Sequence, residues 1–275
     1  MAIRELKKEK TVALKSSVGN VLVFDADDTL WMLEWLYSKS YSTFFSFVYG
    51  VFGPMAPNLA SLQEAFFKIE GRLYPEWGVK RGRVAEAMVL TYREVCRWAK
   101  MRFGRELYTK QDEERIRDIG DIPFDYTHLT WLPEARRALS ILRQRGDMLC
   151  LLSSYDSTLF PAKAEFLKIG EFFALERMRT TEIAKTKEDF IAASGWTPET
   201  DKTRLWFAVG NSESDIVPAL EISGRWRGIY VPHGSTSAYF KHKDRFNGFN
   251  PFPSNDDRIT TLQSLRDMPK LMESF

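Results

Sequence analysis

The stretch Val21-Leu22-Val23-Phe24-Asp25-Ala26-Asp27-Asp28-Thr29-Leu30 determines the fold prediction for this chain of 275 residues. Its four consecutive apolar residues are typical of a strand that is buried on both faces of a parallel sheet. Three acids follow within four positions, where such a strand turns into the next segment. We therefore predict that the first strand ends at Asp25 and that the polar residues of a candidate site begin there.

Strand-and-helix units recur after residue 132. Short apolar runs at residues 148–152, 205–209 and 228–231 alternate with helix-compatible segments, which we place at 133–145, 161–169, 187–194 and 216–222. Repeated units of this kind predict an α/β fold, a Rossmann-like open parallel sheet with helices on both faces. Such sheets bind ligands beyond the carboxyl ends of their strands.

A long insert separates the first strand from these units. Residues 31–126 contain helix-compatible segments separated by Gly and Pro, at 33–52, 58–73, 83–103 and 110–119. We predict that the insert forms an α-helical cap domain. The α/β core would then consist of residues 1–30 and 127–275, with an irregular loop at 246–257, where Pro, Gly and Asn gather.

The composition excludes several functional classes. Lys and Arg number 39 against 37 Asp and Glu, so the charge predicts neither nucleic-acid nor membrane binding. No apolar run approaches the roughly 20 residues of a membrane span. Cys96 and Cys150 lack zinc-site spacing and are typical of reduced thiols. The charged residues 4–10 do not form a secretory signal, so we expect a cytoplasmic protein; its oligomeric state is not predicted.

The acids after the first strand call for a cation. Asp25, Asp27 and Asp28 repel one another and raise each other's pKa unless a positive charge offsets them. Magnesium is the natural ion, since it prefers oxygen ligands and keeps several waters. With their two-residue spacing, Asp25 and Asp27 can divide the work, one attacking phosphorus and the other moving protons. An acidic loop or a helix N-cap is the alternative interpretation of this stretch taken alone.

Polar residues also follow two of the later strands. Ser153 and Ser154 come directly after residues 148–152, where a hydroxyl and backbone amides can hold phosphate oxygens. The stretch Gly210-Asn211-Ser212-Glu213-Ser214-Asp215 follows residues 205–209. Taken separately, each is an ordinary turn with Ser or Asp capping a helix. Their order and their placement at three strand ends together predict one phosphate and metal site.

The sequence resembles the haloacid dehalogenase superfamily, in which four motifs occur in this order. Asp25 and Asp27 match the paired aspartates of the first motif, and Ser153 matches the Ser or Thr of the second. Asp215 matches the last acid of the fourth motif, whereas Asn211 stands where Asp is commonest. The resemblance is specific for the superfamily and weak for any substrate.

The third motif of this superfamily needs a lysine, and both Lys185 and Lys187 qualify. We favour Lys185, because Ala184-Lys185-Thr186 resembles the Lys-Thr form of relatives whose fourth motif also begins Gly-Asn-Ser. The resemblance covers residues 21–30 and 132–234. His233, near its end, is interpreted as a loop histidine.

The resemblance implies a magnesium-dependent phosphatase acting on a small phosphomonoester. Asp25 would attack phosphorus to form an aspartyl-phosphate, and Asp27 would protonate the leaving alkoxide and then activate water. The implied substrate-binding residues are Ser153, Ser154 and Lys185. The implied ligands of Mg²⁺ are Asp25, Asp27 through its backbone carbonyl, Asp215 and Asn211.

The resemblance also implies that residues of the cap recognise the leaving group of the substrate. The candidates are polar and aromatic cap residues, each of which is more often a surface or packing residue: Arg72, Tyr74, Trp77, Arg81 and Arg83.

Other functions remain open at this point. A haloacid dehalogenase shares the aspartate nucleophile but lacks the second aspartate, so Asp27 argues against it. A phosphomutase shares the pair and is not distinguished by these motifs. A non-catalytic binding protein of the same fold would explain Asn211 but not the retained acids. A response-regulator receiver domain is disfavoured by the long insert.

Overall fold

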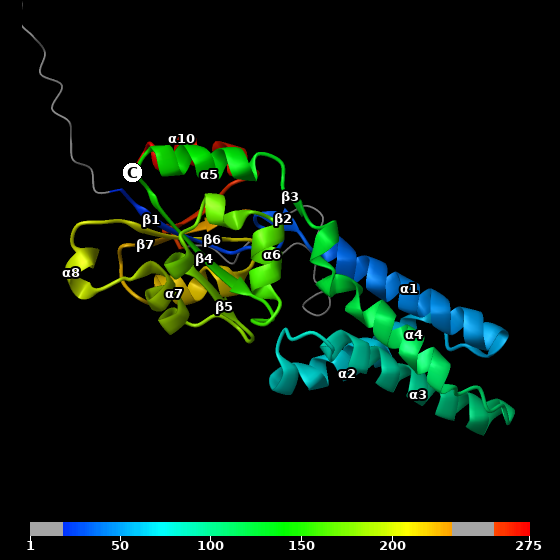
Figure 1. Ribbon diagram of the computed structural model, residues 1–275. Helices are drawn as coiled ribbons and strands as arrows, with labels where there is room; N and C mark the ends of the chain where they lie inside the picture. Colours follow the sequence, from blue (N-terminus) through cyan, green and yellow to red (C-terminus); the bar gives the residue numbers. More distant parts are fainter. Residues whose placement is uncertain (1–18, 233–255) are drawn as a thin grey trace, which may run out of the picture.

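The computed structural model describes residues 19–232 and 256–275 (Figure 1). His233, residues 4–10 and most of the loop expected at 246–257 lie outside these ranges. The main sheet has six parallel strands in the order β5-β4-β1-β6-β7-β8. They are β1 (Val21–Phe24), β4 (Met148–Ser154), β5 (Met178–Thr181), β6 (Trp206–Gly210), β7 (Trp226–Tyr230) and β8 (Ile259–Thr261). The predicted open parallel sheet is confirmed.

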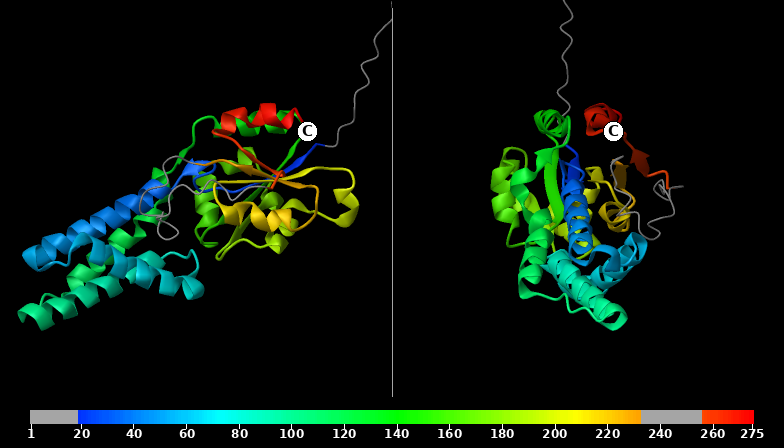
Figure 2. Two further views of the ribbon diagram at one scale, coloured as in Figure 1. Left: turned by 180° about the vertical axis from the view of Figure 1, so that it is seen from behind. Right: turned by 90° about the vertical axis from the view of Figure 1, so that its right-hand side faces the viewer.

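Helices cover both faces of this sheet (Figures 1 and 2). Side chains alternate along a strand, so Leu22 and Phe24 of β1 join one hydrophobic cluster while Val21 and Val23 join another. The first cluster includes residues of α5 (Ala135–Gln144) and α10 (Met268–Met272). The second includes residues of α7 (Lys187–Ser194) and α9 (Val217–Leu220). Burial on both faces explains why β1 reads as an uninterrupted apolar run. The remaining core helices are α6 (Phe160–Phe166) and α8 (Pro198–Asp201).

The insert folds as helices with a hydrophobic cluster of their own. Its helices are α1 (Glu34–Phe52), α2 (Leu59–Trp77), α3 (Arg83–Phe103) and α4 (Lys110–Asp121). They extend from one end of the sheet as a separate layer (Figure 1). A short antiparallel ribbon of β2 (Trp31–Met32) and β3 (Thr130–Trp131) lies where the chain enters and leaves them. No helix within the described ranges is long and apolar enough to cross a membrane.

The loop between α2 and α3 contacts the α/β core. Val79 N donates to the Glu182 carbonyl at 2.8 Å, and Lys80 Nζ lies 2.9 Å from the Glu182 carboxylate. Arg81 N donates to Asp156 Oδ2 at 2.9 Å. Gly78 has φ of +58°, and a Cβ there would lie 1.8 Å from the Glu182 carbonyl oxygen, so this close approach requires glycine. Because Asp156 and Glu182 follow β4 and β5, these contacts hold the insert beside the carboxyl ends of the strands.

Candidate active site

Three neighbouring strands bring the sequence motifs together. β1 lies between β4 and β6, with Phe24 in register with Leu151 on one side and Val209 on the other. The residues that follow these strands therefore meet at one edge of the sheet, as is usual for ligand sites in open α/β folds.

Asp25 lies at the centre of this edge and is almost fully buried. Lys185 Nζ donates to Asp25 Oδ1 at 2.5 Å and to Asp215 Oδ1 at 2.6 Å. Thr29 Oγ1 donates to Asp25 Oδ2 at 2.9 Å. Both oxygens of Asp25 are thus held in a fixed direction. Lys187, the other candidate lysine, is half exposed and lies 3.9 Å from Glu188.

The different positions of the two lysines follow from the start of α7. Thr186 is the N-cap of this helix and forms a capping box with Asp189. Lys185 precedes the cap and reaches back to the sheet edge, while Lys187 is the first residue of the helix and projects outward.

Asp215 is oriented by the turn after β6. Its Oδ2 accepts hydrogen bonds from Ser212 N at 2.9 Å and from Ser212 Oγ at 2.6 Å. A Cβ at Gly210 would lie 2.2 Å from Asp215 Cβ, so the turn needs glycine there. Asp215 Oδ1 is left to face Lys185. Asn211 adds its side-chain oxygen, which accepts a hydrogen bond from Thr29 Oγ1 at 3.3 Å.

The electrostatics of this cluster leave excess negative charge. Burial, reinforced by the nearby Asp215 carboxylate, raises the pKa of Asp25 to about 7. Burial alone would lower the pKa of Lys185, but the carboxylates of Asp215 and Asp25 outweigh it and raise that pKa. A divalent cation beside these acids would favour their ionised forms.

The donor atoms at this edge fit magnesium. Asp25, Asp215 and Asn211 supply oxygen only, and two acids share a single ammonium, so their charge is not balanced by Lys185 alone. Within residues 19–232 and 256–275, no three His, Cys, Asp or Glu side chains converge on one point. Such a cage is not required, because Mg²⁺ usually takes one or two carboxylates and keeps several waters.

Asp28 has a different task from the other two acids of the first motif. Its φ is +58°, and its Oδ1 accepts hydrogen bonds from Leu33 N at 2.8 Å and Glu34 N at 3.0 Å. The carboxylate therefore satisfies free backbone donors where α1 begins. Burial raises the pKa of Asp28 to about 6. The sequence grouped all three acids around a cation, but the structure assigns this one to the helix start.

Asp27 is held by two donors on the same oxygen. Trp31 Nε1 and Lys163 Nζ each lie 2.5 Å from Asp27 Oδ1. Its Oδ2 accepts no hydrogen bond from any residue that the structure describes. Lys163 is not among the residues predicted from the sequence. The available signal was its spacing with Phe160 and Leu167, which puts a lysine on a buried stripe of α6.

Ser153 and Ser154 separate at the end of β4 because neighbouring side chains point to opposite faces. Ser153 is fully buried, and its hydroxyl has no hydrogen-bond partner in the described part of the chain. Ser154 Oγ instead lies 3.5 Å from the Ile183 carbonyl. An unsatisfied buried hydroxyl on the strand next to Asp25 suits an oxygen-rich ligand, since buried polar groups normally find partners.

Several of the cap residues proposed for the leaving group already have partners. Arg81 forms an ion pair with Asp121 at 2.6 Å. Arg83 pairs with Glu70, and its guanidinium lies 5.3 Å from the centre of the Tyr74 ring. Arg83 is buried, and its Nε has no partner in residues 19–232 and 256–275. These contacts show packing within the insert and identify no leaving-group contact.

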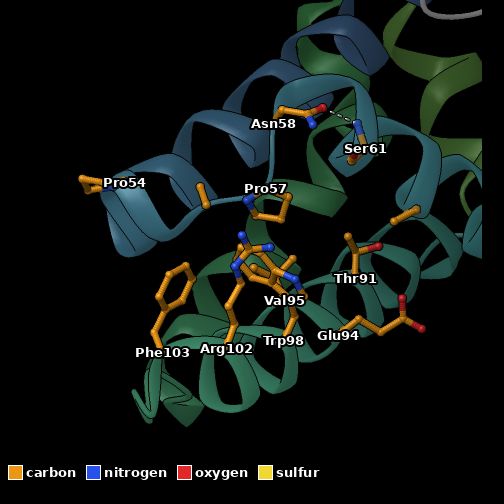
Figure 3. A pocket seen from close by; sticks show the side chains of 12 residues that line it. Pro54, Pro57, Asn58, Ser61, Thr91, Glu94, Val95, Trp98, Arg102 and Phe103 are labelled. Atoms are coloured by element: carbon orange, nitrogen blue, oxygen red, sulfur yellow. Dashed lines mark hydrogen bonds between the residues drawn. The ribbon is translucent and has the colours of Figure 1, made fainter.

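The insert also contains a pocket far from Asp25 and Asp215 (Figure 3). Its volume is about 600 Å³, and it lies around the ends of α1 and α3 that are most distant from the sheet. Its lining includes Thr91, Val95, Trp98, Arg102 and Phe103. None of the predicted site residues borders it.

Comparisons with known proteins support the fold assignment. No family model matches the chain, and no curated protein sequence matches it. Among solved structures, a haloacid dehalogenase-like family hydrolase from Xanthomonas campestris is 18% identical, with a TM-score of 0.70 over 94% of this chain and 93% of that one. The chain thus has the fold of the haloacid dehalogenase-like hydrolases, as the resemblance predicted.

Two further structures show how varied the matches are. The HAD-hydrolase YfnB from Bacillus subtilis, described as bound to magnesium, is 13% identical with a TM-score of 0.55, covering 93% of this chain and 99% of that one. L-2-haloacid dehalogenase from Xanthobacter autotrophicus is 14% identical with a TM-score of 0.55, covering 94% and 99%. At these identities the likeness establishes the fold and leaves the reaction to be argued from the site.

Proposed function

We propose that the protein is a magnesium-dependent phosphomonoester hydrolase that acts through an aspartyl-phosphate on a small phosphorylated metabolite. The observation that carries the proposal is the placement of Asp27. This second carboxylate stands two residues from Asp25, with Oδ1 held by Lys163 and Trp31 and Oδ2 left for a reacting group. Displacement at carbon by an aspartate needs no such acid, whereas release of an alkoxide from phosphorus does.

Asp25 acts as the nucleophile. A carboxylate oxygen of Asp25 forms a bond to phosphorus as the bond from phosphorus to the leaving oxygen breaks. Asp27 donates a proton to that leaving oxygen. It then accepts a proton from the water that attacks the phosphorus of the aspartyl-phosphate, which releases phosphate and restores both acids.

Lys185 and Ser153 contribute to the binding of the transferring group. Their ammonium and buried hydroxyl supply donors for phosphoryl oxygens, on which negative charge is concentrated in the transition state. Asp25, the Asp27 carbonyl, Asp215 and Asn211 would hold magnesium. When bound, the ion reduces the repulsion between the nucleophile and an anionic substrate.

The experiment is a screen for phosphate release with magnesium, covering sugar phosphates, nucleotides, phosphoglycolate and flavin mononucleotide. Chloride release from short 2-chloro acids is measured in parallel, with Asp25→Asn as the inactive control. Phosphate release that needs magnesium and Asp25 supports the proposal. Chloride release without phosphate release refutes it, and phosphate transfer only with a sugar bisphosphate present indicates a phosphomutase instead.

A further inference from the structure

Lys163 occupies a position where an apolar residue is expected. It lies on the inner stripe of α6 between Phe160 and Leu167, and its side chain has no solvent exposure. Lysine is almost never fully buried unless it is paired, because removing an ammonium from water costs several kcal/mol. A fully buried lysine therefore requires a compensating partner, which here is Asp27.

The surroundings of Lys163 direct its charge to one atom. Its Nζ lies 2.5 Å from Asp27 Oδ1 and 3.7 Å from the centre of the Tyr155 ring. The centre of the Trp31 ring lies 5.2 Å from the same ammonium nitrogen, and the indole N–H of Trp31 also donates to Asp27 Oδ1. The two aromatic rings confine the ammonium, and both hydrogen bonds end on a single carboxylate oxygen.

We infer that Lys163 is a positioning residue which, together with the Trp31 indole, fixes the Asp27 carboxylate so that Oδ2 faces the leaving group. The inference rests on the proposed function, since it assigns a task to the acid of that reaction. Lys163 acts through Asp27 and is too buried to contact substrate itself.

We call these two donors on Asp27 Oδ1 a clamp, and its physical advantage is that it fixes the orientation of the carboxylate. A free aspartate side chain rotates among several rotamers, and misplacement of a reacting group by about 1 Å can cost 10²-fold in rate. Two donors from different segments, one on α6 and one at the start of β2, restrict both rotation and tilt of this carboxylate. The acid is therefore in place before the substrate binds.

The competing explanation is an ion pair that serves only the packing of α6 against the sheet. The two explanations predict a different dependence of the activity lost on replacing Lys163, both on the presence of Asp27 and on the leaving group. A clamp matters only when Asp27 is present and the leaving oxygen needs a proton. A packing role lowers activity in every background and for every substrate.

The test is a double-mutant cycle with Lys163→Met and Asp27→Asn, assayed as kcat/KM with magnesium. Two substrates are compared: 4-nitrophenyl phosphate, whose leaving group needs no proton, and benzyl phosphate, whose leaving group does. General acid catalysis contributes about 10²–10⁴-fold. We expect Lys163→Met to lower the benzyl reaction at least about 10-fold more than the nitrophenyl reaction. In the Asp27→Asn background it should change either reaction by less than about twofold, the usual scatter of additivity.

Two further variants serve as controls. Lys187→Met removes an exposed lysine outside the cluster and should leave both reactions unchanged. Trp31→Phe keeps an aromatic ring but removes the second donor, so it should shift the substrate ratio in the same direction as Lys163→Met. Thermal melting with magnesium shows whether each variant is folded. Should Lys163→Met fail to fold, Trp31→Phe carries the same comparison.

Equal losses for both substrates, or an undiminished effect of Lys163→Met in the Asp27→Asn background, would overturn the inference while leaving the hydrolase function intact. An unchanged substrate ratio in Trp31→Phe would do the same. A wild-type protein that releases no phosphate from any monoester refutes the proposed function itself, and the assigned task of Lys163 with it.

Discussion

Replacement of Lys185 by Ala removes the ammonium that joins Asp25, the proposed nucleophile, to Asp215, a proposed magnesium ligand. In the structure this group makes two charge-assisted contacts, 2.5 Å to Asp25 and 2.6 Å to Asp215, in an almost fully buried setting. Loss of one preorganised donor to a transition state typically costs about 3–4 kcal/mol, or 10²–10³ in kcat. Lys187, half exposed and 3.9 Å from its nearest acid, should contribute about 0.5 kcal/mol or less. We therefore expect Lys185→Ala to be at least about 100-fold slower than Lys187→Ala.

The assay is steady-state hydrolysis of 4-nitrophenyl phosphate with saturating magnesium. Removal of Lys185 also leaves two buried carboxylates unpaired, which destabilises a fold by about 3–5 kcal/mol when only one partner of a buried pair is removed. Thermal melting must therefore show that the variant is folded at the assay temperature, and Lys185→Met supplies a version that better fills the space. Comparable activity of the Lys185 and Lys187 variants would refute the reasoning, as would a larger loss for Lys187→Ala.

The other expectations concern the acids and their cation. Asp27→Asn should lose far more activity toward benzyl phosphate than toward 4-nitrophenyl phosphate, and equal losses of kcat/KM would contradict its role as acid. Chelation should abolish phosphate release and added magnesium restore it, whereas activity in a thoroughly chelated sample excludes the metal-assisted reaction. Because Asp28 has its pKa raised to about 6, against about 3.9 unfolded, stability should fall as pH rises from about 4 to about 6. Without metal, Asp28→Asn should remove this loss and gain up to about 3 kcal/mol at pH 8; equal melting shifts at pH 4 and pH 8 would disprove it.

The sheet was predictable where its strands are buried on both faces. β1, β4 and β6 each contain a short apolar run, because helices cover both faces of the sheet there. In β7 the apolar run begins only at Gly228, after Arg227. β5 and β8 were missed, and both lie at edges of the sheet. β5 reads Met178-Arg179-Thr180-Thr181 and is only partly buried, so it carries no continuous apolar signal.

The helices of the insert were predictable largely from the Gly and Pro residues that separate them. Gly53 and Gly104 follow the ends of α1 and α3, both with positive φ, and both ends were predicted. The second segment was predicted to end at residue 73, but α2 continues through Pro75 to Trp77 and ends only before Gly78. The docking of the loop at Gly78 against Glu182 was not predictable. It depends on an approach between segments about 100 residues apart, for which a single sequence gives no spacing rule.

The site was predictable in its motifs and not in its supporting contacts. Asp25 and Lys185 stood out because each follows a strand of the sheet or precedes a capped helix. Lys163 did not, since a lysine in a short helix normally faces solvent and its pairing with Asp27 spans 136 positions. Asp28 was grouped with its neighbours because the positive φ that turns it toward α1 is a property of the folded loop.

The most direct test of the central claim is to trap the covalent intermediate. The protein is mixed with 4-nitrophenyl phosphate and magnesium, quenched in acid within one turnover, digested and examined by mass spectrometry, with Asp25→Asn treated in the same way. We expect a phosphoryl group on the side chain of Asp25, in the peptide that carries this residue, and no phosphorylated peptide from the variant. Phosphate release with no phosphorylated peptide, or with the phosphoryl group on another residue, would contradict it.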